Sequence, residues 1–212
     1  MFVVPRESRI DGILSRRLGE ILPSGAAGAV RRIGIEDDRL LSPAESVCIG
    51  RAVLARRRAS GAARMLARSL LSFPSEPHPD IFWSSSGAPI WPAGIVGSLG
   101  HDEFVAAAIV GSSAAFGGLG VDVEAAEPLD DELIPIVATP DEQRAFDDPL
   151  QAKVLFCVKE AVFKAVNPLD GRFLGFDEIV VDPVSGLATT SYGRVVRWRS
   201  VAQPRVLAVA WW

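Results

Sequence analysis

The stretch "FCVKEAVFKAV", Phe156–Val166, belongs to a segment whose apolar residues recur at helical spacing. It predicts a helix over about 149–166, ended by Asn167 and Pro168. Beyond this helix the pattern changes to an alternation of apolar and polar residues, which is typical of half-buried strands. The alternating segments are "FDEIVVD", "LATTSY", "RVVRWRS" and "RVLAVAWW". The C-terminal part of the chain is therefore predicted to be a helix followed by an antiparallel sheet.

The same signals extend toward the N-terminus. Helical spacing covers about 6–20 and 42–70, where Ser42 precedes a proline and stands three residues before a glutamate. A turn-rich section follows, then strand-like runs at Glu103–Gly111 and Gly118–Glu124, and short helices around 128–146. We predict an α+β protein with an N-terminal half over 1–115 and a C-terminal half over 116–212.

Composition limits the classes of function. The chain has 212 residues, 49% of them hydrophobic and 23% charged, which suits one large or two small globular domains. No apolar run approaches the ~20 residues that span a bilayer, and the N-terminus lacks a signal-peptide pattern, so we expect a cytoplasmic protein without a membrane partner. The net charge of -4 argues against nucleic acid as a partner. We expect both cysteines, Cys48 and Cys157, to be buried free thiols.

Lysine is confined to one part of the chain. There are nineteen arginines but only three lysines, which are Lys153, Lys159 and Lys164. Glu160 and Lys164 are i,i+4 neighbours, and an ordinary surface pair of this kind contributes only ~0.3–0.5 kcal/mol. Lysine offers a compact charge and a transferable proton, whereas arginine stays protonated and presents a broad plane. The retained lysines indicate proton donation or a tight fit against a pyrophosphate.

The predicted helix over 42–70 is strongly cationic. Six arginines and no acidic residue lie between Ser46 and Ser75. Arg64 and Arg68 are four residues apart, so several guanidinium groups can share one helix face. This face is either simply solvated or a surface for a phosphate-rich ligand or an acidic partner, because arginine binds phosphate oxygens in pairs. Composition leaves both interpretations open.

Carboxylates and histidines supply further candidates. Asp122 and Glu124 project from one face of their predicted strand, as the polar face of any half-buried strand also would. His101 is expected between a Gly-Ser-Leu-Gly turn and a strand, satisfied by local backbone groups, and His78 in a solvated proline-rich loop. Histidines and cysteines are too few for a zinc site. Any metal should be hard and oxygen-bound, and Mg²⁺ suits two or three carboxylates completed by phosphate oxygens and water.

Four motifs occur in a fixed order. They are "GAPIWPAGIVGSLGH" (Gly87–His101), "GVDVE" (Gly120–Glu124), "FCVKEAVFKA" (Phe156–Ala165) and "LGF" (Leu174–Phe176). In order and spacing they resemble the 4′-phosphopantetheinyl transferase superfamily, in its Sfp-type branch, and most of all siderophore and polyketide synthase members such as the enterobactin synthetase component D. The resemblance runs from about Arg56 to Val181. It implies two similar α+β halves related by a pseudo-two-fold axis, with the active site in the cleft between them.

The resemblance also implies an activity and its residues. Such an enzyme moves the phosphopantetheine arm of coenzyme A to a serine of an apo carrier protein and releases 3′,5′-ADP. Asp122, Glu124 and Glu160 would surround Mg²⁺, and Glu160, directly or through a metal-bound water, would take the serine proton. Lys164 would neutralise or protonate the leaving phosphate. The residues expected to bind coenzyme A are Arg56 and Arg64 at the 3′-phosphate, His101 at a phosphate, Lys159 and Lys164 at the pyrophosphate, and Trp83 at the nucleotide, with Arg68 a weaker candidate.

Two positions depart from the family pattern. Trp83 stands where several relatives carry a lysine that reaches the phosphates of the coenzyme, and Gly100 stands where relatives usually have Ser or Thr. We therefore expect Trp83 either to stack on adenine or to close the apolar edge of the cleft. The expected protein is a monomer that serves siderophore, nonribosomal peptide or polyketide synthesis. The alternatives are a non-catalytic module that binds acidic carrier proteins and another Mg²⁺-dependent nucleotide transferase.

Overall fold

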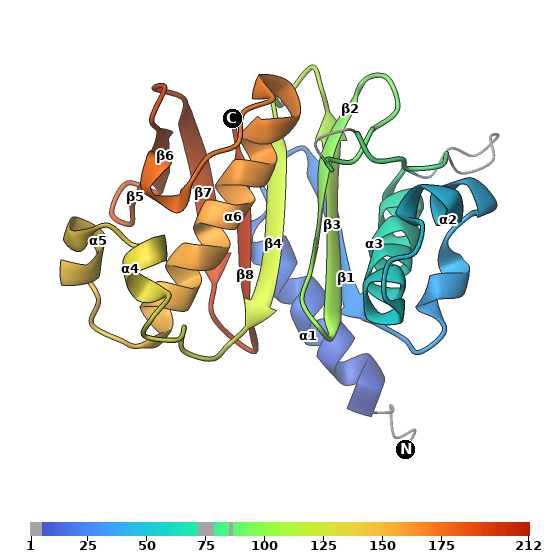
Figure 1. Ribbon diagram of the computed structural model, residues 1–212, viewed down its shortest axis with the longest axis horizontal. Helices are drawn as coiled ribbons and strands as arrows, with labels where there is room; N and C mark the ends of the chain where they lie inside the picture. Colours follow the sequence, from blue (N-terminus) through green and yellow to red (C-terminus); the bar gives the residue numbers. More distant parts are fainter. Residues whose placement is uncertain (1–5, 72–78, 85–86) are drawn as a thin grey trace.

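The computed structural model describes residues 6–71, 79–84 and 87–212, and it contains two antiparallel sheets (Figure 1). The first has the strand order β1-β3-β2, with β1 at Ala26–Arg32, β2 at Ile95–His101 and β3 at Val105–Ser112. The second has the order β4-β8-β7-β6-β5, with β4 at Leu119–Ala125, β5 at Ile179–Asp182, β6 at Leu187–Thr190, β7 at Val195–Val201 and β8 at Arg205–Trp211. The predicted α+β class and the antiparallel C-terminal strands are confirmed.

Helices cover these sheets. They are α1 (Arg6–Ile21), α2 (Pro43–Ile49), α3 (Leu54–Leu70), α4 (Ile134–Val137), α5 (Pro140–Arg144) and α6 (Leu150–Asp170), with 3₁₀ turns η1 (Asp37–Leu40) and η2 (Phe176–Glu178). Figure 1 shows α3 beside the first sheet and α6 across the second. Leu14 and Leu18 of α1 share one core cluster with Ile109, Val121 and Leu207, so α1 joins the two sheets. Among the described helices, not one combines the length and the apolar character that a membrane crossing requires.

Glycines in β4 bring α6 unusually close to the second sheet. A Cβ atom at Gly120 would lie 1.8 Å from the Ala161 carbonyl oxygen, and one at Gly118 would lie 2.0 Å from that of Ala165. No side chain fits in so little space, so the glycines allow the backbone of the helix to rest against the strand. This close packing brings the polar residues of α6 beside the carboxylates of β4.

A second close approach joins the two sheets. A Cβ atom at Gly100 of β2 would lie 2.8 Å from the Val121 carbonyl oxygen and 3.2 Å from the Asp122 Cα atom. A serine or threonine here would therefore press on β4. The departure from the family pattern at Gly100 thus has a steric explanation, because in this chain β2 runs directly against β4.

Several sequence predictions need correction. The helix predicted over 42–70 is two helices, because Gly50 ends α2 with a positive φ of 58°. The capping box at Ser42 is confirmed. Helix α6 passes through Pro168 to Asp170, since one missing N–H near the helix end is tolerated and the left-handed Gly171 closes the helix with a bond to the Asn167 carbonyl.

The remaining corrections concern the first sheet and the thiols. The predicted turn before His101 is strand β2, and β1 was not predicted, because both segments are rich in glycine and alanine and carry little alternation. Cys48 is exposed, whereas Cys157 is buried as expected. The loop prediction for His78 lies outside the described residues.

Candidate functional site

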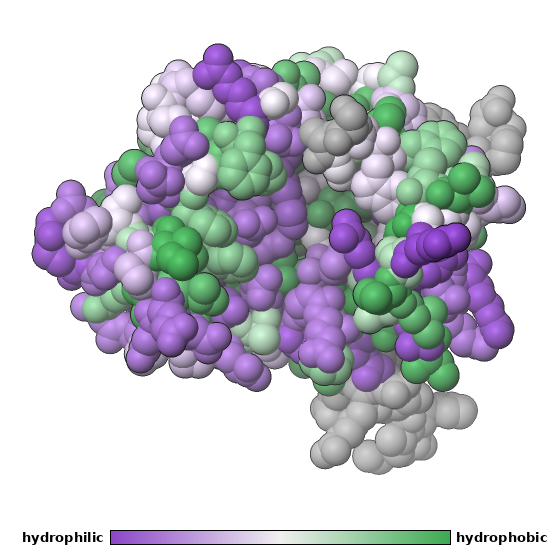
Figure 2. Space-filling model, in the orientation of Figure 1, coloured by the Kyte–Doolittle hydropathy of each residue, from purple (hydrophilic) through white to green (hydrophobic). Residues whose placement is uncertain are grey.

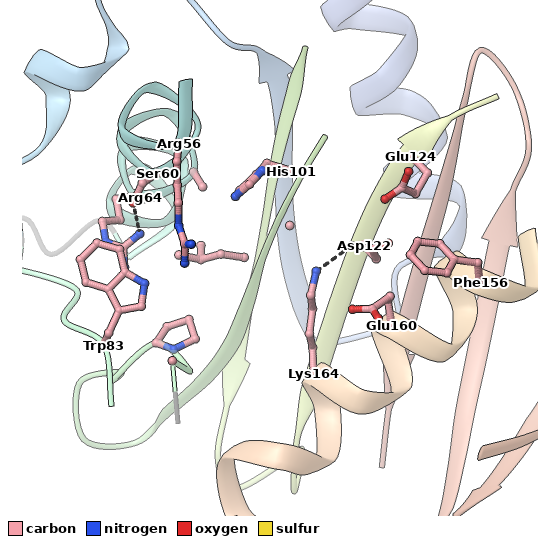
Figure 3. Close-up of a pocket in the computed structure, with 15 residues that line it drawn as sticks. Arg56, Ser60, Arg64, Trp83, His101, Asp122, Glu124, Phe156, Glu160 and Lys164 are labelled. Atoms are coloured by element: carbon pink, nitrogen blue, oxygen red, sulfur yellow. Dashed lines mark hydrogen bonds and ion pairs between the residues drawn. The ribbon is translucent and has the colours of Figure 1, made fainter. Parts of the chain in front are cut away.

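A pocket of about 330 Å³ lies between α3 and α6, and residues of both sheets line it (Figure 3). In the space-filling view, hydrophilic residues gather along the middle of this face, between the two helices (Figure 2). All of the predicted site residues except Lys159 and the weaker candidate Arg68 line the pocket: Arg56, Arg64, Trp83, His101, Asp122, Glu124, Glu160 and Lys164. The pocket thus has a cationic wall from α3 and an acidic wall from β4 and α6.

The acidic wall consists of Asp122 and Glu124 on β4 and Glu160 on α6 (Figure 3). Burial raises the pKa values of Glu124 and Glu160, and the nearby charge of Asp122 raises both further. Asp122 is 4% exposed, and its Oδ2 atom has no hydrogen-bond partner in the described part of the chain. A desolvated, all-oxygen group of mutually repelling carboxylates is chemically suited to a hard cation.

The acidic wall is not a preformed metal cage, however. Among the residues that the structure describes, no group of three or more His, Cys, Asp or Glu side chains has the arrangement that holds an ion. Asp122 Oδ1 instead accepts a hydrogen bond from Lys164 Nζ at 2.6 Å. The Oδ2 atom of Asp122 is therefore the carboxylate oxygen that still lacks a positive partner, and it is itself buried.

Lys164 stands at the centre of the pocket, as Figure 3 shows. Its ammonium also donates to the Val121 carbonyl at 3.3 Å. Burial by itself would lower the pKa of Lys164, but the charges of Asp122 and Glu160 outweigh it and raise the pKa. Lys164 is therefore firmly charged at neutral pH, which favours neutralisation of a phosphate over donation of a proton.

Arg64 anchors the cationic wall. Its Nε atom donates to the Ile81 carbonyl at 2.8 Å, its Nη1 atom donates to Ser60 Oγ at 2.7 Å, and its guanidinium lies 3.4 Å from the centre of the Trp83 ring. The side chain is buried, and this burial lowers its pKa to about 10, so it stays charged at neutral pH. Its Nη2 atom has no partner among the described residues. An unpaired N–H on a buried, fixed guanidinium is a ready donor to a bound anion.

Arg56, Trp83 and His101 complete this wall. Arg56 is exposed, and Trp83 is half-buried with one ring face already covered by Arg64. His101 ends β2, and its pKa is lowered, first because the surrounding protein displaces water and second because the Lys164 ammonium is near. A neutral imidazole at pH 7 can still donate one hydrogen bond to a phosphate oxygen.

Lys159 does not line the pocket, and the prediction that it contacts the pyrophosphate is corrected. The side chain is 0% exposed, and its ammonium donates to Glu142 Oε2, the Val137 carbonyl and the Phe176 carbonyl at 2.8, 2.8 and 2.9 Å. Lys159 and Glu160 are adjacent in the sequence, yet the helical rotation of about 100° between them turns the lysine into the protein interior.

Three other arginines of α3, Arg57, Arg58 and Arg68, have local partners, and those of Arg57 are the Gly50 carbonyl and Ser46 Oγ. Arg68 pairs with the fully buried Glu45 at 2.7 Å, and Arg58 lies 3.8 Å from Asp38. Arg68 is therefore not a pocket residue. Glu45 and Asp38 both precede the segment from Ser46 to Ser75 that contains no acidic residue, so only the fold shows that they neutralise its arginines.

Sequence reasoning missed Ser60 and Phe156 as pocket residues. It also missed the structural role of Glu45, whose Oε1 atom accepts from the Ile81 backbone N–H at 2.9 Å and so holds the segment that leads to Trp83. The capping box marked Glu45 as a helix residue, but nothing in the sequence indicated a contact with Ile81.

Comparisons with known proteins match most of the chain to one family. Protein-family models match residues 44–111 as a 4′-phosphopantetheinyl transferase N-terminal domain and residues 118–210 as the 4′-phosphopantetheinyl transferase superfamily. The chain is 38% identical to the 4′-phosphopantetheinyl transferase Npt of Nocardia iowensis over 162 residues, covering 74% of this chain and 72% of that protein. It is 34% identical to the transferase Svp of Streptomyces mobaraensis over 183 residues (81% and 74%), and 34% identical to PptT of Mycobacterium tuberculosis over 141 residues (64% and 62%).

Proposed function

The chain belongs to the 4′-phosphopantetheinyl transferase superfamily, and from this membership we propose how its pocket binds the substrates and carries out the transfer. The protein is a 4′-phosphopantetheinyl transferase that uses coenzyme A and acts on apo carrier proteins. The observation that carries the assignment of roles is the single pocket with a cationic wall opposite an acidic one. A coenzyme with three phosphates and a metal-dependent pyrophosphate needs both.

Coenzyme A lies along the cationic wall. Arg56 and the unpaired Nη2 of Arg64 bind the 3′-phosphate, and His101 donates to a further phosphate. Trp83 stacks on adenine with the ring face that Arg64 leaves open. Lys164 reaches the pyrophosphate because it stands between this wall and the carboxylates.

Asp122, Glu124 and Glu160 would hold Mg²⁺, which would neutralise the charge of the pyrophosphate. The buried, unpartnered Oδ2 of Asp122 and the raised pKa values of the two glutamates support this assignment. Lys164, which pairs with Asp122 in this structure, would also interact with phosphate oxygens when coenzyme A is bound.

The transfer makes one P–O bond and breaks another. The serine hydroxyl of the carrier attacks the β-phosphorus, the bond from this phosphorus to the bridging oxygen breaks, and 3′,5′-ADP leaves. Glu160 accepts the serine proton, and burial supports this role because it raises the carboxylate pKa toward the working pH. The Lys164 ammonium neutralises the charge that develops on the leaving phosphate.

The wider assignments rest on the motif resemblance. We place the division of the chain between 1–115 and 116–212, with the halves related by a pseudo-two-fold axis and the active site in the cleft between them. Two sheets, with α3 packed against the first and α6 against the second, support this arrangement. We further assign the enzyme, acting as a monomer, to carriers of siderophore, nonribosomal peptide or polyketide synthesis.

Mass spectrometry tests the proposal. The wild-type protein, Mg²⁺, coenzyme A and an apo carrier protein should give a carrier that has gained a phosphopantetheine arm. Asp122→Ala and Glu160→Ala should each abolish this gain without loss of fold, because both residues line the polar pocket. Transfer at the normal rate by either variant would remove that residue from the site, and a panel of carriers from different pathways would define the specificity.

A further inference from the structure

Lys159 and Glu142 form a buried ion pair behind the acidic wall. The 2.8 Å contact between Lys159 Nζ and Glu142 Oε2 leaves the two side chains 0% and 8% exposed. Lys159 uses its remaining N–H groups on the carbonyls of Val137, at the end of α4, and Phe176, in η2. An ammonium has three N–H donors, so its hydrogen bonding is complete without a ligand.

Glu142 is equally saturated. Its Oε2 atom also accepts from the Thr139 backbone N–H at 2.8 Å, and its Oε1 atom accepts from the Val181 N–H at 3.0 Å. The pair therefore ties α4, α5, η2 and β5 to α6. A charged group is buried only when its partners compensate for the hydration that it loses. Removing one member of a buried ion pair strongly destabilises the protein, because the other charge is left without a partner.

The pair reaches the pocket through two aromatic rings. Lys159 holds the Phe176 carbonyl, and the Phe176 ring packs against Phe156 with a centroid distance of 5.4 Å. Phe156 lines the pocket together with Glu124 and Glu160 (Figure 3). A shift of Phe176 would therefore also move Phe156, which lines the pocket with Glu160, the proposed base.

We propose that Lys159 and Glu142 are positioning residues for the transfer reaction. They hold Phe176, and Phe176 in turn holds Phe156 in the pocket next to Glu160. Neither Lys159 nor Glu142 contacts coenzyme A. This inference rests on the proposed function of the pocket. It gives Lys159 a role different from that of Lys164, although both lie on the same helix.

The test uses the full chain and the double variant Lys159→Met/Glu142→Gln, which removes both buried charges together and keeps an acceptor at position 142. The matched control is Val196→Ala, which weakens the same core from β7, where Val196 is buried and does not line the pocket. Coenzyme A affinity is measured by calorimetry, and kcat is measured at saturating coenzyme A and carrier well below the unfolding temperature. Phe176→Leu removes the ring contact while leaving the ion pair intact.

The double variant and Phe176→Leu should bind coenzyme A within about threefold of the wild type, while kcat of the double variant falls at least about tenfold because the wall is misplaced. Phe176→Leu should lower kcat in the same direction, and Val196→Ala should leave kcat unchanged. A tenfold loss of coenzyme A affinity in the double variant would show that Lys159 contacts the ligand. Unchanged kcat in the double variant or in Phe176→Leu would reduce the pair to a purely structural role. A wild-type protein without transfer activity would instead contradict the proposed function itself.

Discussion

Gly120→Ala should separate the two parts of the acidic wall. In the structure, a Cβ atom at Gly120 would lie 1.8 Å from the Ala161 carbonyl oxygen and 2.8 Å from the Ala165 nitrogen. Both atoms belong to the backbone of α6, which cannot rotate away as a side chain could. The helix must therefore retreat by roughly 1.5 Å before the new methyl group reaches ordinary van der Waals contact.

The size of the effect follows from this displacement. Overpacking of a core by one carbon typically costs about 1–3 kcal/mol of stability, and a contact with rigid backbone should lie at the upper end of this range. The same retreat moves Glu160 and Lys164 away from Asp122, to which Lys164 now donates at 2.6 Å. A misplacement of about 1 Å in an active site can lower the rate roughly 100-fold, so we expect kcat to fall by about that factor.

Urea unfolding and steady-state transfer to an apo carrier measure the two effects. Gly19→Ala is the matched control, because it makes the same substitution in α1, where nothing lies within 4 Å of the new Cβ atom. Alanine at an exposed helical position should stabilise the protein by roughly 0.5–1 kcal/mol and leave turnover unchanged. Gly120→Ala protein with the stability and turnover of the wild type would refute the argument that this close approach builds the site.

Three further predictions concern the pocket itself. Lys164→Arg should be badly impaired in transfer although it conserves charge, because the broad guanidinium cannot occupy the position of an ammonium that donates to both the Val121 carbonyl and Asp122 Oδ1. Turnover at the wild-type rate would overturn the interpretation of the retained lysine. Trp83→Ala should lose stacking on adenine and so weaken coenzyme A binding about tenfold in calorimetry, with little change in kcat. Trp83→Lys should partly restore binding and make it more dependent on salt. Unchanged affinity in Trp83→Ala would show that the indole only packs against the protein. Burial, and secondly the charge of Asp122, raise the pKa of Glu160 in the folded protein. Ionised Glu160 therefore destabilises the fold near neutral pH, and this destabilisation disappears as the pH falls toward 4.5. Glu160→Gln should raise the melting temperature of the metal-free protein at pH 7 and should lose this advantage in acid. Added Mg²⁺ should stabilise only the wild type. A Glu160→Gln variant that is less stable than the wild type at pH 7 without metal would contradict the raised pKa.

Local patterns were sufficient for much of the fold and for most of the candidate site. The capping box at Ser42 and the alternation in the C-terminal strands predicted real elements, because they reflect interactions within a few residues of the chain. The resemblance of the motifs predicted that Asp122 and Glu160, more than thirty residues apart, act together, and both residues line one pocket. The class of the fold and the family were therefore determined by the sequence itself.

Distant contacts decided what the sequence left open. Strand β2 carries glycine at Gly97 and Gly100, which gives no alternation, and it becomes a strand because it pairs with β3 and packs against β4. Among the arginines of α3, Arg68 is occupied by Glu45, while Arg64 is held by Ile81 and lines the pocket with a buried Nη2 atom that has no partner among the described residues.

Lys159 and Lys164 show the same limit most clearly. Both lie on α6 beside similar neighbours, yet one is sealed in the interior by Glu142 and the other faces the carboxylates of the pocket. The direction of each side chain follows from the helical turn, but what each meets depends on elements far away in the sequence. The sequence by itself thus determined which residue types are available for chemistry, and the tertiary structure decided which of them remain open to a ligand, because hydrogen-bond partners and burial arise only when distant segments pack together.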